Sequence, residues 1–234
     1  MAGGKVAVVE RVSLCRAGER AGGAAGGERL CGDLWALQYR ARGVLCASAG
    51  AGGPAVPGSG ARAFTHGVHH RFKDWEALQA FEADALVTEA ERGLEACEDA
   101  VIVRWEGRVE SDIFPLFQRG DEWDAGLEHL LVLGGEDLAG ATARGVEEVM
   151  AQPDLAPLIQ RMSHGLVEQA GELPGDPFGV GEAYAVLLRC RGQKELDAVT
   201  GHPCWQAVTG AEAVRGAFDF NLSVLPVEGA ENVM

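Results

Sequence analysis

The sequence predicts an α+β fold in which two βαββαβ units form one intramolecular, pseudo-dimeric α/β barrel. A strand–corner–helix pattern over residues 64–86 returns about 120 residues later, over 182–203. The Val- and Leu-rich segments 9–14 and 127–133 repeat in the same order. Each unit is therefore expected to be ferredoxin-like, with a four-stranded antiparallel sheet that carries helices on one face. The uncovered faces of the two sheets can bury each other within one chain.

Alternation defines the strand at the start of the repeated pattern. Phe64, Val68 and Phe72 alternate with other side chains, which is the period of a strand with two different faces. Asp74 then stands at a helix N-cap position, and residues 75–85 carry apolar side chains at helical spacing. The segment therefore predicts a strand, a tight corner and a helix.

The remaining elements follow from the same two periods. In the first half we expect strands over 6–15, 43–50 and 99–107, and helices over 30–40 and 86–98. In the second half we expect strands over 127–133, 164–172, 182–190 and 218–228, and helices over 137–151, 193–200 and 204–214. The strand at 164–172 is matched to 42–50 of the first half.

Glycine-rich segments and one connection complete the organisation. The Gly/Ala composition of 17–29 predicts a flexible linker, and glycine and proline make 50–63 a loop. The first unit then covers 5–107, the connection 108–126 and the second unit 127–229. Within the connection, 113–123 is too apolar for a free linker, so we expect it to contact the body or a protein partner.

Composition limits the classes of partner. Hydrophobic residues make up 47% of the 234 residues, enough for a sizeable core, and the net charge is −15. Phosphate neutralisation needs clustered Lys and Arg, so we expect no nucleic-acid partner and no binding to an anionic membrane surface. No apolar run reaches the ~18 residues of a membrane span. The N-terminal segment has no secretory pattern, so we expect a cytoplasmic protein, or a chloroplast one if a transit peptide is missing from this sequence.

No cofactor or metal site is expected from the motifs. His66 and His70 would share one face of a strand about 13 Å apart, and His69 would face the other way. We therefore do not expect the three to be ligands of one Zn²⁺, whose bonds to nitrogen are ~2.0–2.1 Å long. A helical segment would instead align His66 with His70 and would reopen this question. The glycines form no phosphate-binding motif. Six cysteines contain no CxxC pair, which indicates reduced and mostly buried thiols.

Three segments resemble a known family. FTHGVHHRFKDWEAL at 64–78, CEDAVIVRWEG at 97–107 and LEHLLVL at 127–133 resemble the tandem stress-responsive dimeric α/β-barrel (Dabb) proteins of plants and algae. The resemblance covers nearly the whole chain outside the glycine-rich loops. It implies a stress-response barrel that is non-catalytic and acts by binding a small hydrophobic ligand or by association with protein. It also implies a monomeric pseudo-dimer or a weak homo-oligomer, because single-domain relatives form the barrel as homodimers.

The same resemblance bears on catalysis. One relative is a cofactor-independent polyketide cyclase that uses a Tyr and a His. The matching positions here are Val199 and Trp205 in the second half, and Phe81 and Val87 in the first. None of these side chains can transfer a proton, so we assign no catalytic residue. A polyketide-cyclase-like enzyme and an accessory subunit of a larger assembly are the alternatives.

A pocket is expected between the two sheets. The repeat equates His66 with Tyr184 and Arg71 with Arg189. We expect the His66 and Tyr184 side chains to face the barrel interior together with Trp105. The resemblance matches His66 and His129 to pocket histidines of the cyclase. Because small-molecule sites are concave and apolar with few polar groups, these four residues are the predicted pocket lining. The alternative is that His66 and Tyr184 are hydrogen-bonded core residues.

Overall fold

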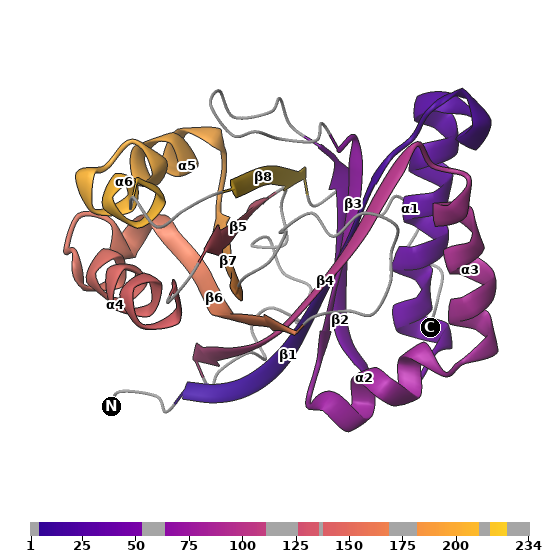
Figure 1. The fold of residues 1–234 in the computed structure, drawn as a ribbon, viewed down its shortest axis with the longest axis horizontal. Coiled ribbons are helices and arrows are strands. Elements are labelled where there is room, and N and C mark those ends of the chain that lie inside the picture. The colour runs from indigo at the N-terminus through magenta and orange to yellow at the C-terminus, as the bar shows by residue number, and fades with distance from the viewer. Residues whose placement is uncertain are drawn as a thin grey trace.

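The computed structural model describes residues 5–52, 64–110, 126–135, 138–168, 182–210 and 216–223 (Figure 1). The first half contains β1 (Lys5–Arg16), a 3₁₀ turn (Glu19–Ala21), α1 (Gly23–Arg40), β2 (Val44–Ala51), β3 (His66–Phe72), α2 (Trp75–Glu82), α3 (Ala85–Glu95) and β4 (Asp99–Glu110). The second half contains β5 (Leu127–Gly135), α4 (Leu138–Ala151), a 3₁₀ turn (Ala156–Leu158), β6 (Ile159–Glu168), β7 (Glu182–Cys190), α5 (Gln193–Thr200), α6 (Pro203–Thr209) and β8 (Gly216–Ser223).

One curled antiparallel sheet contains the eight described strands, in the order β2-β3-β1-β4-β6-β7-β5-β8. Each half has the ferredoxin-like strand order. The halves join where β4 pairs with β6, with Trp105 opposite Val167. Figure 1 shows α1 to α3 outside one half and α4 to α6 outside the other, with the strands between them. The predicted fold class, two ferredoxin-like units in a pseudo-dimeric α/β barrel, is confirmed.

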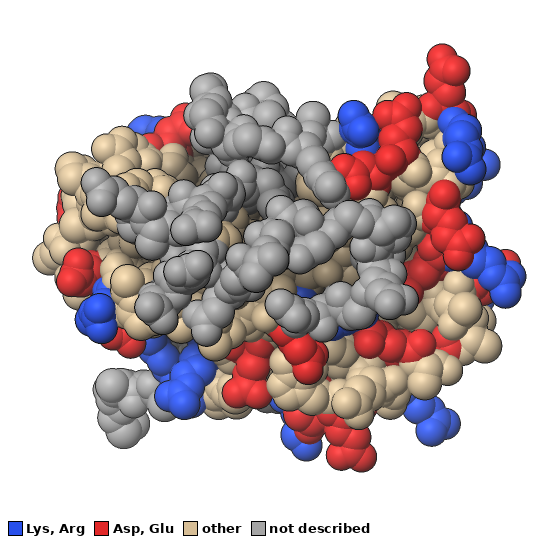
Figure 2. Space-filling view, in the orientation of Figure 1, with Lys and Arg blue, Asp and Glu red and all other residues tan. Residues whose placement is uncertain are grey.

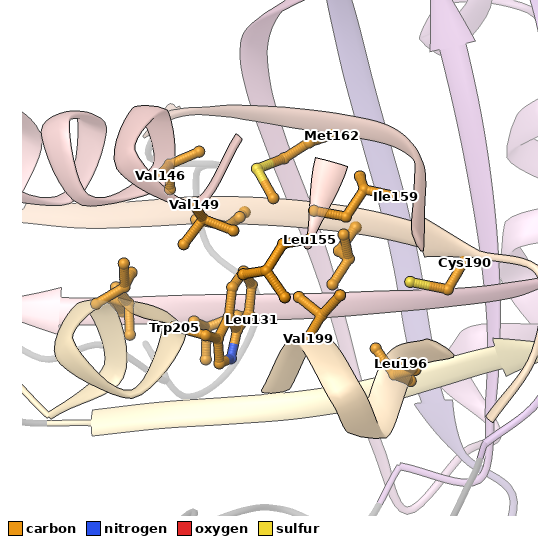
Figure 3. Packing of buried hydrophobic residues seen from close by; sticks show 14 of the residues in the cluster. Leu131, Val146, Val149, Leu155, Ile159, Met162, Cys190, Leu196, Val199 and Trp205 are labelled. Atoms are coloured by element: carbon orange, nitrogen blue, oxygen red, sulfur yellow. The ribbon is translucent and has the colours of Figure 1, made fainter. Parts of the chain in front are cut away.

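Three hydrophobic clusters follow from this layering. The barrel interior is filled from both halves by Val12, Leu14, Phe64, Val101, Val103, Trp105, Leu130, Val132, Ala183, Ala185 and Leu187. A second cluster lies between the first-half sheet and α1 to α3. A third lies between the second-half sheet and α4 to α6 (Figure 3). Each sheet therefore has one face toward the barrel interior and one toward its own helices.

The predicted linker at 17–29 is wrong, because most of it is helical. The helix α1 begins at Gly23, after the 3₁₀ turn and a left-handed Gly22 with φ of 85°. Gly27 lies on the buried side of α1, where an added Cβ would be only 2.3 Å from Cε1 of His66. Glycine thus allows α1 to approach β3 closely, and this packing outweighs its poor helix propensity.

The predicted match of 42–50 with 164–172 is also wrong. Cys46 lies opposite Arg71 in β3, and Arg161 lies opposite Arg189 in β7, so Cys46 and Arg161 are the equivalent residues. The pairing register shifts just before each of them, between Val44 and Cys46 and again after Ile159. Such irregularities interrupt the two-residue alternation on which the prediction relied.

One local prediction is confirmed, and two segments cannot be compared. Asp74 caps α2 by accepting a hydrogen bond of 2.9 Å from the backbone N–H of Ala77. Residues 53–63 of the predicted loop, and the apolar segment 113–123, lie outside the described residues. Among the helices that the structure describes, none is long and apolar enough to cross a membrane.

Candidate functional site

Two ion pairs occupy equivalent positions at one end of the barrel interior. Glu10 of β1 shares a face with Val12 of the interior cluster, and its carboxylate accepts hydrogen bonds of 2.6 to 2.9 Å from the Arg71 guanidinium. In the second half, Arg189 Nη1 donates to Glu128 Oε1 at 3.4 Å. The repeat therefore places a Glu–Arg pair in each half.

His69 connects the two pairs. Its Nε2 lies 2.7 Å from Glu10 Oε2, and its Nδ1 lies 3.1 Å from Glu128 Oε2. The Ser48 hydroxyl also donates to Glu128 Oε2, at 2.5 Å. All four side chains are buried. In β7 the position equivalent to His69 is Leu187, which cannot form such contacts. The His69 bridge between Glu10 and Glu128 therefore exists once, and it joins the first half to the second.

The charges of this network stabilise one another. Burial alone would raise the pKa of Glu10, but the Arg71 and His69 charges outweigh it and lower that pKa to about 2. The pKa of Glu128 is lowered in the same way, against burial, mainly by His69. Burial opposes the charge of His69, yet the two carboxylates raise its pKa above the ordinary 6.5. His69 is therefore an imidazolium whose two N–H groups donate to two carboxylates.

Positive charge exceeds negative charge around the network. Arg161 adds a further positive charge close to Arg71 and to both carboxylates. Burial and the nearby Arg71 charge lower its pKa to about 10. Each carboxylate already accepts bonds from charged donors, so neither is available as a general base. The arrangement joins the two halves through His69.

Of the predicted pocket residues, Trp105 alone belongs to the interior cluster. Its indole Nε1 donates to the Ser163 hydroxyl at 3.2 Å, which links β4 to β6. His66 lies on the opposite face of β3, against Gly27 of α1, and its Nδ1 is 2.9 Å from Thr65 Oγ1. His66 therefore faces the helices of its own half.

Tyr184 and His129 also face helices, in the second half. Tyr184 belongs to the cluster beneath α4 to α6, and the ring of His129 lies 5.7 Å from that of Trp205 in α6. The expectation that His66 and Tyr184 converge in the barrel interior is therefore wrong. Strand alternation defines two faces, but it does not say which one the partner sheet covers.

Tyr184 has a different partner, which the sequence analysis did not find. Its hydroxyl lies 2.7 Å from Nδ1 of His164 in β6. Burial lowers the pKa of His164, and burial with the charge of Glu147 raises the pKa of Tyr184 to about 12. Both side chains are thus neutral near pH 7 and form a hydrogen-bonded pair. The pair was missed because β6 was predicted to begin at residue 164.

Apolar side chains occupy the four positions at which the sequence resemblance would expect the Tyr and His of a cyclase. Val199 and Trp205 point into the second-half cluster and are 0% and 3% exposed (Figure 3). Phe81 and Val87 are both 0% exposed in the first-half cluster. All four contribute to packing between sheet and helices.

A groove of about 700 Å³ lies along α1 and α3 on the outside of the first half. It is lined by Arg20, Ala21, Gly22, Gly26, Arg29, Leu30, Asp33, Leu37, Arg40, Leu86, Glu89, Ala90, Arg92, Gly93 and Ala96. Its lining combines an apolar floor with four arginines and two acidic residues. None of the predicted pocket residues contributes to it.

Across the described residues, no group of three or more His, Cys, Asp or Glu side chains is placed to hold a metal ion. The six cysteines are free thiols, and burial raises the pKa of Cys190 to about 12.

Comparisons with known proteins show similarity at the level of the fold. No family model and no curated protein matches the sequence. A candidate monooxygenase from Fusobacterium nucleatum superposes with a TM-score of 0.62 at 10% identity, over 94% of this chain and 93% of that one. A candidate monooxygenase from Lactobacillus acidophilus gives 0.56 at 9% identity, over 92% of both chains. An anthrone oxidase-like protein gives 0.60 at 14% identity, over 95% of this chain and 92% of that one.

Proposed function

We propose that this protein is a non-catalytic α/β barrel of the stress-response type, which acts by binding a small hydrophobic ligand or by association with protein. One observation carries the proposal. The positions at which the related cyclase has its Tyr and His are Val199 and Trp205 in one half and Phe81 and Val87 in the other, all buried among apolar side chains. A ring closure that needs proton transfer has no acid or base there.

The barrel interior supports the non-catalytic part of this proposal. Its polar end is a network in which Glu10, His69 and Glu128 satisfy one another, and its remainder is closely packed apolar side chains. Buried groups of this kind fix the relative position of the halves. The tandem chain thus has within itself the partner surface that a single-domain barrel obtains from a second copy. We include a cytoplasmic or chloroplast location in this proposal, which imaging of the tagged chain tests.

An acid–base enzyme is the second candidate, and the Tyr184–His164 pair favours it. A tyrosine hydroxyl 2.7 Å from an imidazole nitrogen can donate and recover a proton. The structural similarity to candidate monooxygenases and to an anthrone oxidase-like protein is compatible with such chemistry on this fold.

The experiment that separates the two candidates uses the purified chain and a linear poly-β-ketone substrate. We expect cyclised or oxidised product to form at the rate seen in buffer alone. Tyr184→Phe and His164→Gln should leave this rate unchanged, as should the control Tyr39→Phe, whose side chain is 65% exposed. Turnover that Tyr184→Phe abolishes and Tyr39→Phe retains would establish the enzyme and reject our proposal.

A further inference from the structure

The groove along α1 and α3 has the size of a small-molecule site. Its volume of about 700 Å³ lies within the roughly 300–1,000 Å³ typical of ligand pockets. Leu30 and Leu37 of its floor belong to the first-half core, and Leu86 at its rim is 39% exposed. Glycines at positions 22, 26 and 93 line it without side-chain volume. Because Leu30 and Leu37 are 8% and 2% exposed, the apolar surface open to a ligand body comes from Leu86 and from the alanines of the lining.

The charge of the groove is opposite to that of the chain. The whole sequence has 20 basic and 35 acidic residues, whereas the groove is lined by four arginines and two acids. Arg92 pairs with Glu89. Among the described residues, Arg20, Arg29 and Arg40 form no hydrogen bond or ion pair, and all three residues are exposed. Figure 2 shows blue basic side chains among red acidic ones along the edge formed by α1 and α3.

We propose that this groove binds a small anionic amphiphile, with a carboxylate head held by arginines and an acyl or aromatic body against Leu86 and the alanines of the lining. This inference rests on the proposed binding function and specifies its ligand class. Guanidinium groups bind carboxylates through paired hydrogen bonds, and their methylene stems extend the apolar wall. An amphipathic helix about 10 Å wide and three turns long would need more than about 1,000 Å³, so a small molecule fits better.

The test compares ligands that differ in the head group alone. The purified chain is titrated calorimetrically with decanoate, decyltrimethylammonium and decyl glucoside, each below its micelle concentration. We expect saturable one-to-one binding of decanoate, weaker binding of the glucoside and no binding of the cation. Added salt should weaken the binding of decanoate, because exposed charges are screened. Equal binding of all three ligands, or no binding of decanoate, would overturn the proposal.

Three exposed substitutions locate the site. The double variant Arg29→Gln/Arg40→Gln should bind decanoate about fivefold more weakly, since each exposed ion pair contributes modestly. Leu86→Glu should abolish binding, because it places a carboxylate at the rim. An acidic side chain in the first turn of α3 is favourable, so this variant should fold. Arg191→Gln, at an exposed position of the second half, is the matched control and should bind like the parent.

The remaining outcomes are also decisive. A double variant that binds decanoate like the parent would place the ligand elsewhere and reject the groove. Binding to anionic phosphatidylglycerol vesicles without binding of monomeric decanoate would replace the proposed ligand with a membrane surface. Neither result would change the turnover of the poly-β-ketone, so failure of this inference is distinguishable from failure of the proposed function.

Discussion

His69 Nδ1 lies 3.1 Å from Glu128 Oε2, which makes a buried ion pair between the first and second halves of the barrel. His69 also contacts Glu10 of its own half, so one imidazolium holds two carboxylates that the repeat places at equivalent positions. Removing one member of a buried pair leaves an uncompensated charge. The stability of the whole barrel, and not of one half, should therefore depend on this contact.

The first prediction concerns the loss of that pair. Glu128→Gln keeps the shape of the side chain, but it leaves the Arg189 charge without its carboxylate and leaves His69 with Glu10 alone. We expect the free energy of unfolding to fall by about 3 kcal/mol. Urea denaturation followed by circular dichroism measures it. The control Glu148→Gln, at an exposed site of α4, should change stability by no more than about 0.5 kcal/mol. Equal effects of the two substitutions would contradict a role for the bridge.

The second prediction is a pH window for the network. The pKa of His69 is raised in the folded state, so its contribution is complete below the ordinary 6.5 and is lost as the pH rises through the folded value. The pKa values of Glu10 and Glu128 are lowered from the ordinary 4.5. Their contributions are present above 4.5 and are lost as the pH falls, toward about 2 for Glu10. The network should therefore contribute most between 4.5 and 6.5.

The measurement is the difference in unfolding free energy between the parent and Glu128→Gln at three pH values. One pH value lies between 4.5 and 6.5, one lies below this window and one lies above it. The difference isolates the network, because other titrating groups act on both proteins. We expect it to be largest inside the window. A difference that rises steadily toward alkaline pH would show that His69 is not charged in the folded state.

Much of the fold was predictable because local periodicity and the global repeat agree. The strand β7 and the helix α5 have the predicted bounds, 182–190 and 193–200. The first part of α1 was not predicted, because glycines disfavour a helix in isolation. The helical Gly27 is explained only by its close contact with β3. Propensity describes a residue without its tertiary neighbours.

The candidate site was less predictable, although part of its signal was present. The repeat equated Arg71 with Arg189, and Glu10 and Glu128 lie in the two matching Val- and Leu-rich segments. Charged residues at equivalent positions of predicted core strands indicate buried ion pairs. The bridging role of His69 could not be derived in this way, since its repeat partner is Leu187 and the contact depends on how the two sheets face each other.

The third prediction concerns His70, which points to the helices of the first half. Its Nε2–H donates to the Leu34 carbonyl at 3.0 Å, while its buried Nδ1 has no hydrogen-bond partner among the described residues. Burial, then the charge of Arg11, lowers the pKa of His70 to about 3. A base with a lowered pKa contributes stability above the ordinary 6.5 and loses it as the pH falls.

His70→Phe should remove this acid sensitivity. The rings of Phe72 and Phe81 lie 6.3 and 5.1 Å from the imidazole, so a phenyl ring has aromatic neighbours. Losing one hydrogen bond costs about 1 kcal/mol, and burial of a more apolar ring offsets it near neutral pH. The measurement is unfolding free energy at neutral and at acidic pH. If the variant loses as much stability on acidification as the parent, His70 does not titrate in the way described.

The fourth prediction concerns the close contact between β4 and β6. A Cβ added at Gly165 would lie 2.1 Å from the backbone oxygen of Glu106 and 3.2 Å from Cδ1 of Trp105. The backbone oxygen cannot move without displacing β4, so Gly165→Ala should lower the unfolding free energy by about 3 kcal/mol. The matched control is Gly140→Ala in α4, where the nearest atom, Arg144 Nη1, is 3.7 Å away. That change should raise stability by about 0.5–1 kcal/mol, because alanine favours helix. Urea unfolding of both variants measures these changes in unfolding free energy. A Gly165→Ala protein as stable as the parent would mean that the two halves can join without the close approach of β4 and β6.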